Sequence, residues 1–187
     1  MKQSDDDLFP SNGALLKLAK PVVKLKKNQQ FYPQCFSHKL TLAPIKMILT
    51  NFEIEDMIGI RYSGQYFDLH NDFAFNGFKY SVAGLALELE WAIIDNEADG
   101  IVQNQIHGLI LLFSNVNYLR IQERDFEMPV SEDKCLSVIG YLPQEMRDVM
   151  DSFGDKPDYE DDDMIMMFQG GQTFKINATQ VELIPKK

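Results

Sequence analysis

The densest chemical feature of the sequence is a run of carboxylates just before a strongly apolar stretch. Five acids occur in six residues, with only Tyr159 between them: Asp158, Glu160, Asp161, Asp162 and Asp163. A calcium loop needs oxygen ligands at defined spacings and a glycine at its tight turn, and "DYEDDDMIMMFQ" has no glycine there. Clustered like charges repel one another and favour a solvated connection. We therefore predict a solvated loop, which could also dock a basic protein partner.

A second calcium-like pattern occurs in "DNEADGIVQNQI". Asp95, Glu97, Asp99 and Gly100 stand at the first, third, fifth and sixth positions of an EF-hand loop. The twelfth position should be a bidentate glutamate, but it is Ile106. Since the flanking segments also have strand patterns and not helical ones, we interpret this stretch as a polar hairpin loop and predict no metal site.

His70 lies in the densest polar cluster of the remaining chain, the segment "FDLHNDF". Asp68, Asn71 and Asp72 surround it, but nothing there resembles a nucleophile elbow. The chain also has no GxGxxG or GxxxxGK[ST] motif for phosphate binding. We interpret the cluster as a turn at a strand end, and we predict no cofactor and no catalytic residue. A ligand pocket or active site near His70 is the alternative.

Aromatic residues are concentrated around the same cluster. The segment "RYSGQYFDLHNDFAFNGFKY" holds more tyrosine and phenylalanine than one strand pair can bury. Exposed tyrosines mixed with polar residues are typical of protein interfaces. Tyr62, Tyr66, Asp68 and His70 are therefore further candidates for partner binding.

Overall charge and cysteine content restrict the class of protein. The net charge of −10 disfavours binding to a nucleic-acid backbone or an anionic membrane, and it favours a cationic partner or plain solubility. Two cysteines, Cys35 and Cys135, form neither a zinc motif nor a disulfide framework. No apolar run reaches the roughly 18 residues of a membrane span, and the first ten residues carry acids where a secretion signal carries positive charge. We expect a cytoplasmic protein.

The charge changes sharply near Met47. Residues 1–46 contain eight lysines and three aspartates, a net charge of +5, which leaves −15 for the rest. We predict a basic extension at 1–46 and a single β-rich domain at 47–187. The extension could be a strap folded on the acidic domain, a flexible tail, a membrane-surface segment, or a non-native segment if translation begins at Met47. Pro21 interrupts its short apolar face, so we favour a loosely attached or non-native segment.

Period-2 patterns predict strands through most of 47–187. In "LALELEWAI" one face carries Leu85, Leu87, Leu89, Trp91 and Ile93. The segment "IHGLILLFSNVNYLRIQ" is apolar on both faces, which predicts a central strand covered on both sides. A third strand is expected at "CLSVIGYL".

The C-terminal part predicts a hairpin and a helix. "MIMMFQ" and "QTFKI" flank Gly170-Gly171, a pair suited to a tight turn. "PQEMRDVMDSFG" has an apolar stripe at helical spacing, with Pro143 at its start and Gly154 at its end. The fold class we predict is α+β and mainly β: antiparallel sheets in a sandwich or half-barrel, with one short helix at about 143–153 packing on an open face.

The order "LELEW…LILLFSNVNYLRI…EDKCLSVIGY…FQGGQTFKINATQVEL" resembles small bacterial immunity-type and uncharacterised single-domain β-rich proteins. The resemblance covers residues 80–184 and consists of packing and turn positions. It implies a cytoplasmic protein that binds and neutralises a toxin domain, commonly through an acidic surface.

These observations lead to three hypotheses about function. The first is a non-enzymatic bacterial protein-binding module, with an immunity-type inhibitor of a basic toxin domain as its most specific form. The second is a small-ligand binder or enzyme with a pocket near His70. The third is a self-associating structural subunit, which would make the protein a homo-oligomer.

Overall fold

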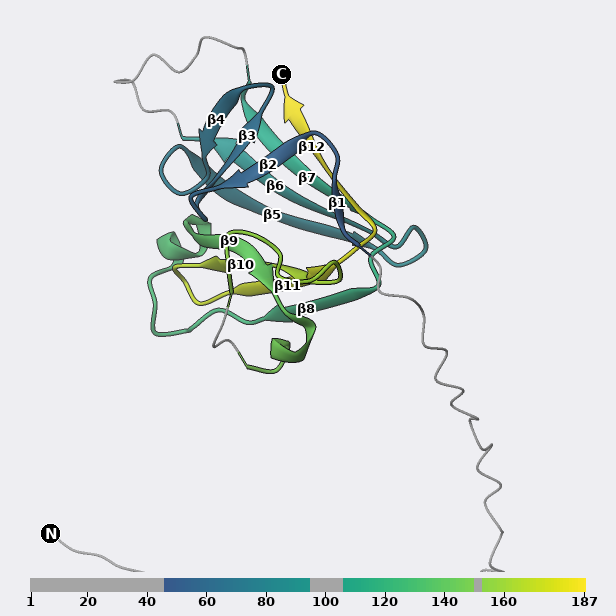
Figure 1. The fold of residues 1–187 in the computed structure, drawn as a ribbon. Helices are drawn as coiled ribbons and strands as arrows, with labels where there is room; N and C mark the ends of the chain where they lie inside the picture. Colours follow the sequence, from purple (N-terminus) through teal and green to yellow (C-terminus); the bar gives the residue numbers. More distant parts are fainter. Residues whose placement is uncertain (1–45, 95–105, 150–152) are drawn as a thin grey trace, which may run out of the picture. The chain divides into compact units, whose positions relative to one another are not determined.

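The computed structural model describes residues 46–94, 106–149 and 153–187 (Figure 1). These residues form three open β-sheets and two 3₁₀ turns, η2 (Val130–Lys134) and η3 (Gln144–Met146). The mainly-β part of the prediction is therefore confirmed. Residues 1–45 and the calcium-like loop at 95–105 lie outside the described residues, so the extension at 1–46 stays a prediction.

The largest sheet has five strands, and its order differs from the order along the chain. It runs β1 (Ile48–Leu49), β12 (Gln180–Lys186), β7 (Gly108–Ser114), β6 (Ala86–Ile93), β5 (Phe73–Ser81). All neighbours are antiparallel except β1 and β12, which are parallel. The chain thus brings its C-terminal strand between the first strand of the domain and the central pair β7–β6.

The second sheet is fully antiparallel and holds the predicted C-terminal hairpin. Its order is β8 (Tyr118–Gln122), β11 (Thr173–Asn177), β10 (Asp163–Phe168), β9 (Leu136–Leu142). β10 and β11 pair around the Gly-Gly turn, where Gly171 has a φ of +85°. A residue with a side chain is strained at such an angle. The Gly-Gly pair that predicted this turn therefore also permits its backbone conformation.

The third sheet is a small meander, β2 (Phe52–Glu55), β3 (Gly59–Tyr62) and β4 (Gln65–Asp68). The Arg61 guanidinium donates to both carboxylate oxygens of Glu55 across the β2–β3 pair, at 2.6 and 2.7 Å.

Two connecting segments join the five-stranded sheet to the four-stranded sheet, and the two segments contact each other. The chain leaves β7 for β8 through Asn115 and returns from β11 to β12 through Thr179. The Asn115 amide donates to the Thr179 hydroxyl at 2.9 Å. Asn115 has a φ of +53° directly after β7, so this residue ends the strand.

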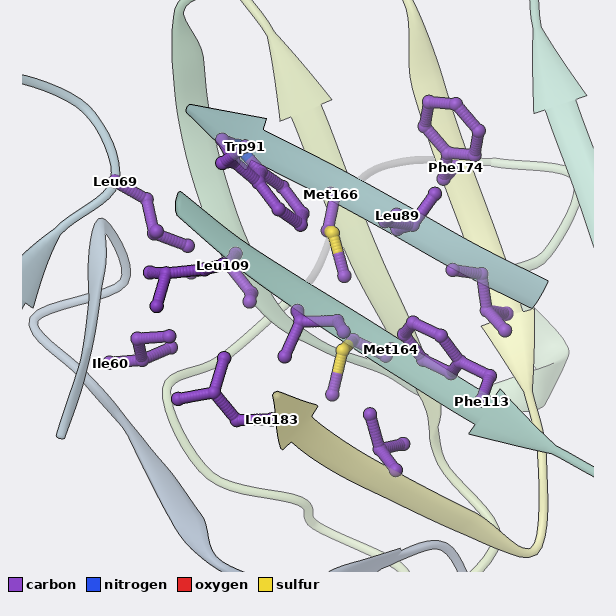
Figure 2. Close-up of a cluster of buried hydrophobic side chains, with 14 of the residues drawn as sticks. Ile60, Leu69, Leu89, Trp91, Leu109, Phe113, Met164, Met166, Phe174 and Leu183 are labelled. Carbon is purple, nitrogen blue, oxygen red and sulfur yellow. The ribbon is translucent and has the colours of Figure 1, made fainter. Parts of the chain in front are cut away.

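One buried hydrophobic cluster draws on all three sheets (Figure 2). Trp91 of β6 contacts Phe75 of β5 at a ring-centroid distance of 5.2 Å, and Phe75 contacts Phe174 of β11 at 5.8 Å. Ring pairs at these distances contribute beyond their buried area. The faces of the two larger sheets that carry these rings thus share a single core.

The predicted core face of β6 is correct from Leu87 to Trp91 and wrong at Leu85. Leu87, Leu89 and Trp91 are fully buried. Leu85 precedes the strand, has a φ of +45° and is exposed. The turn between β5 and β6 reverses the chain there, so the apolar alternation extends one residue further than the strand. A bulge lies in β5, between Phe75 and Gly77.

Strand β7 is central, as predicted, but its two faces differ. Leu109, Leu111 and Phe113 are fully buried, whereas Ile110 and Leu112 are only partly buried. The prediction of cover on both sides is therefore met fully on the core face and only in part on the other, where the outward side chains retain contact with solvent.

The predicted helix at 143–153 is also wrong. Within 143–149 only Gln144–Met146 is helical, as a 3₁₀ turn, and Val149 is exposed. Side chains from the four-stranded sheet bind the backbone carbonyls that a helix would use. Lys175 Nζ donates to the carbonyl oxygens of Arg147 and Val149, and Arg120 Nη1 donates to that of Arg147 at 3.2 Å. These bonds satisfy the carbonyl groups without a helix.

Trp91→Ala should lower the free energy of unfolding by about 3–5 kcal/mol, because it leaves a cavity where the sheets meet. Urea unfolding of the full chain measures the change. Leu85→Ala is the control, and it should change the free energy by less than about 0.5 kcal/mol since Leu85 is exposed. Equal effects of the two substitutions would contradict the assigned core.

Candidate functional site

The acidic run is divided between buried and exposed carboxylates. Asp162 and Asp163 are buried, at 3% and 0% exposure, although their charges would favour water. Asp158 and Glu160 are exposed and Asp161 is half-buried. The prediction that all five project into solvent is therefore wrong for the last two, which lead into and begin β10.

Asp163 is held by Arg147 in a two-point ion pair. Arg147 Nε donates to Oδ2 at 2.6 Å, and Nη2 donates to Oδ1 at 2.8 Å. The guanidinium also lies over the Tyr118 ring, 3.8 Å from its centroid. This hydrogen bonding raises the pKa of Arg147. A planar guanidinium matches a carboxylate at two points, which offsets the cost of burying the Asp163 charge.

Asp162 closes the loop on itself. Its Oδ2 accepts the backbone N–H groups of Asp158 and Tyr159, at 2.8 and 3.1 Å. Its Oδ1 is buried and has no hydrogen-bond partner among the residues that the structure describes. The loop is therefore shaped by its own inner carboxylate.

Side-chain amides from two neighbouring elements fix the remaining backbone of the loop. The carbonyl oxygen of Asp161 accepts Gln144 Nε2 at 2.8 Å and Asn177 Nδ2 at 2.9 Å. Because Asn177 is buried at the end of β11, this part of the loop is anchored to the four-stranded sheet.

A cavity of about 200 Å³ lies beside this loop. Three carboxylates, two tyrosines and one lysine contribute to its wall: Asp158, Glu160, Asp162, Tyr141, Tyr159 and Lys46, with Met47 and Pro157. Burial raises the pKa of Tyr141 to about 12. Lys46 Nζ lies 3.7 Å from Glu160 Oε1, and both side chains are largely exposed. The wall carries a net negative charge, which suits a cation.

His70, another predicted binding residue, lies at the far end of β9. His70 Nδ1 is 2.5 Å from the carbonyl oxygen of Leu136, the first residue of β9, whereas Asp163 pairs with Leu142, the last. Seven strand residues span about 20 Å. The structure therefore does not unite His70 and Asp68 with the acidic run.

Tyr62 and Tyr66 are engaged with the protein itself. Tyr62 is half-buried and packs against the core. Tyr66 is half-buried, with its ring so close to Gly59 that a Cβ there would be 2.5 Å from it. Both side chains thus have contacts within the fold, and their role in partner binding stays a prediction.

His70 has a neighbour that sequence reasoning missed, Cys135, 65 positions away. Cys135 Sγ is 3.6 Å from His70 Nδ1. A carbonyl oxygen can only accept, so the bond to Leu136 requires a proton on Nδ1, and that nitrogen cannot take one from the thiol. Burial of the thiol raises the pKa of Cys135, and the nearby negative charges of Glu132 and Asp68 raise it further. This arrangement favours a neutral thiol, the opposite of an activated nucleophile.

Among the described residues, no group of three or more histidines, cysteines, aspartates or glutamates is placed to hold a metal ion. The same part of the chain contains no helix with the length and apolar character of a membrane span.

No family model, curated protein or solved structure matches this chain. The resemblance to immunity-type proteins therefore stays a prediction.

The division of the acidic run can be tested by stability. Asp163→Asn should lower the free energy of unfolding by about 3 kcal/mol, because it leaves the Arg147 guanidinium without its partner. The control Asp158→Asn/Glu160→Gln should change it by less than about 0.5 kcal/mol, since both side chains are exposed. Urea unfolding at neutral pH distinguishes the two, and equal, small effects would mean that Asp163 is solvated after all.

The raised pKa of Tyr141 predicts that the protein loses stability at alkaline pH. Its folded pKa of about 12 lies above the unfolded value of 10, so between these values the unfolded chain loses the phenol proton first. Stability should therefore fall as pH rises through this window, by up to roughly 3 kcal/mol from this group. Urea unfolding of Tyr141→Phe at successive pH values isolates the contribution. An identical pH slope in both proteins would show that Tyr141 titrates normally.

Proposed function

We propose that this chain is a non-enzymatic protein-binding module that docks a basic protein partner on its acidic loop. The observation that supports it most is the anchoring of the loop. Asp162 and Asp163 are buried and bonded, while Asp158, Tyr159 and Glu160 are exposed. A loop fixed before binding loses less entropy when a partner docks.

The exposed part of the loop has the composition of an interface. Tyr159 is 59% exposed, and tyrosine is among the residues that contribute most at the centre of interfaces. The two carboxylates beside it and the net charge of −10 would attract a basic surface and speed its association. In its most specific form, the module is a cytoplasmic immunity-type inhibitor in a bacterium, and the partner is a basic toxin domain.

A test starts by capturing the partner from native lysate with the full chain. Association of the purified partner is then measured by biolayer interferometry at low and high salt. Asp158→Asn/Glu160→Gln should slow association about tenfold at low salt, and the difference should shrink at high salt as charges are screened. Glu123→Gln/Glu127→Gln removes the same charge from exposed positions elsewhere and should have a smaller effect. Equal rates for the wild type and the loop variant at low salt would defeat the proposal.

Self-association is a second candidate, favoured by exposed apolar side chains near the turn between β5 and β6. Phe78, Tyr80 and Leu85 are exposed, and Val82 is 76% exposed. Exposed apolar side chains grouped near one turn often mark an interaction site.

If copies associate through this turn, Val82→Asp/Leu85→Asp should convert the oligomer to a monomer, because the charges would be buried in the contact. Light scattering after gel filtration measures the mass. Val130→Asp, at a residue that is 70% exposed in η2, is the control. A wild-type chain that elutes as a monomer at high concentration would eliminate this candidate.

A further inference from the structure

The cavity beside the acidic loop has an excess of negative charge at its wall. Asp158, Glu160 and Asp162 contribute carboxylates, and Lys46 contributes the only ammonium group among the described lining residues. Lys46 is placed loosely, since its Nζ is 3.7 Å from Glu160 and mostly exposed. The wall can therefore accept a further positive charge.

A cation in this cavity would also stabilise the buried carboxylate of Asp162. Its carboxylate is buried, has no ion-pair partner among the described residues and bonds only backbone N–H groups through Oδ2. Oδ1 bonds nothing in the described part of the chain. A buried charge without a counter-charge is unfavourable. A cation brought into the neighbouring cavity would lower that cost through its field, and would do so without touching Oδ1.

The size and the aromatic content of the cavity restrict what that cation can be. Its volume of about 200 Å³ lies below the roughly 300–1,000 Å³ of pockets for drug-sized ligands. It suits a single side chain and not a whole metabolite. Tyr141 and Tyr159 lie on the wall, and aromatic rings attract cations and cover an apolar stem.

We propose that this cavity is a subsite for one lysine side chain of the protein partner. The inference rests on the proposed function and adds the group that is recognised. The ammonium lies between the carboxylates of Glu160 and Asp162, and its methylene stem lies against the tyrosines. Lys46 already holds an ammonium group at the edge of the same cavity, so it competes weakly with the incoming lysine.

The test uses the ¹⁵N-labelled full chain and a small probe, N-acetyl-lysine methylamide. Its titration should shift the backbone amides of Tyr141, Tyr159 and Asp162 in a saturable manner. N-acetyl-norleucine methylamide, which lacks the charge, should shift none of them. Asp158→Asn/Glu160→Gln should weaken probe binding about fivefold or more, and Lys46→Gln should strengthen it about twofold. Asp162→Asn should also weaken it, and the double variant keeps the test valid if that protein does not fold.

Several results would overturn the subsite. They are equal shifts with the norleucine probe, shifts that do not saturate, or an unchanged affinity in the double variant. Tighter binding of 1,4-diaminobutane than of the lysine probe, by about tenfold, would show a site for a free amine and not for a partner side chain. If the probe does not bind but the double variant still slows the partner, the subsite is wrong and the docking loop stands. If the probe binds but the partner's rate does not change, the docking proposal is wrong.

Discussion

The bidentate pair between Arg147 and Asp163 is the interaction on which the acidic loop depends. Asp163 starts β10 and pairs with the last residue of β9, while the carbonyl of Arg147 is bound by Lys175 of β11 and Arg120 of β8. Residues of three of the four strands, β8, β10 and β11, therefore contact one arginine, and β9 pairs with its partner Asp163. Because the Asp163 carboxylate is fully buried, the pair holds only in this geometry, and the geometry fixes where the loop enters the sheet.

Lys175 shows how much this arrangement relies on close packing. Its side chain is buried and its Nζ is bonded to main-chain carbonyls, and burial lowers its pKa. The position of the 143–149 segment thus depends on a cation whose charge is disfavoured by its surroundings. The carbonyl oxygens that it binds satisfy the buried ammonium group, which offsets part of that cost. The same bonds keep this segment in a turn instead of the helix that its sequence favours.

Sequence patterns predicted what is decided locally and failed where distant residues decide. Alternation identified β6, β7 and β9, and the Gly-Gly pair identified the β10–β11 turn, because each reports a single strand or turn. The helix at 143–153 failed because Lys175 and Arg120, far along the chain, bind its carbonyls. The burial of Asp163 was missed for the same reason: nothing near it in sequence shows that Arg147 will face it. The Cys135–His70 contact joins residues 65 positions apart and leaves no local signal.

The acidic run combines a fixed loop shape, which its buried carboxylates provide, with attraction of a partner, which its exposed carboxylates provide. The two properties respond differently to salt. Exposed carboxylates are screened within a Debye length of about 8 Å at physiological salt, so attraction by Asp158 and Glu160 varies with ionic conditions. Buried groups are screened much less, so anchoring by the hydrogen bonds of Asp162 and the ion pair of Asp163 does not vary in the same way. The shape of the loop should therefore persist at salt concentrations that abolish its long-range field. A partner that binds this loop would then lose association rate with added salt sooner than it loses the fit of the bound complex.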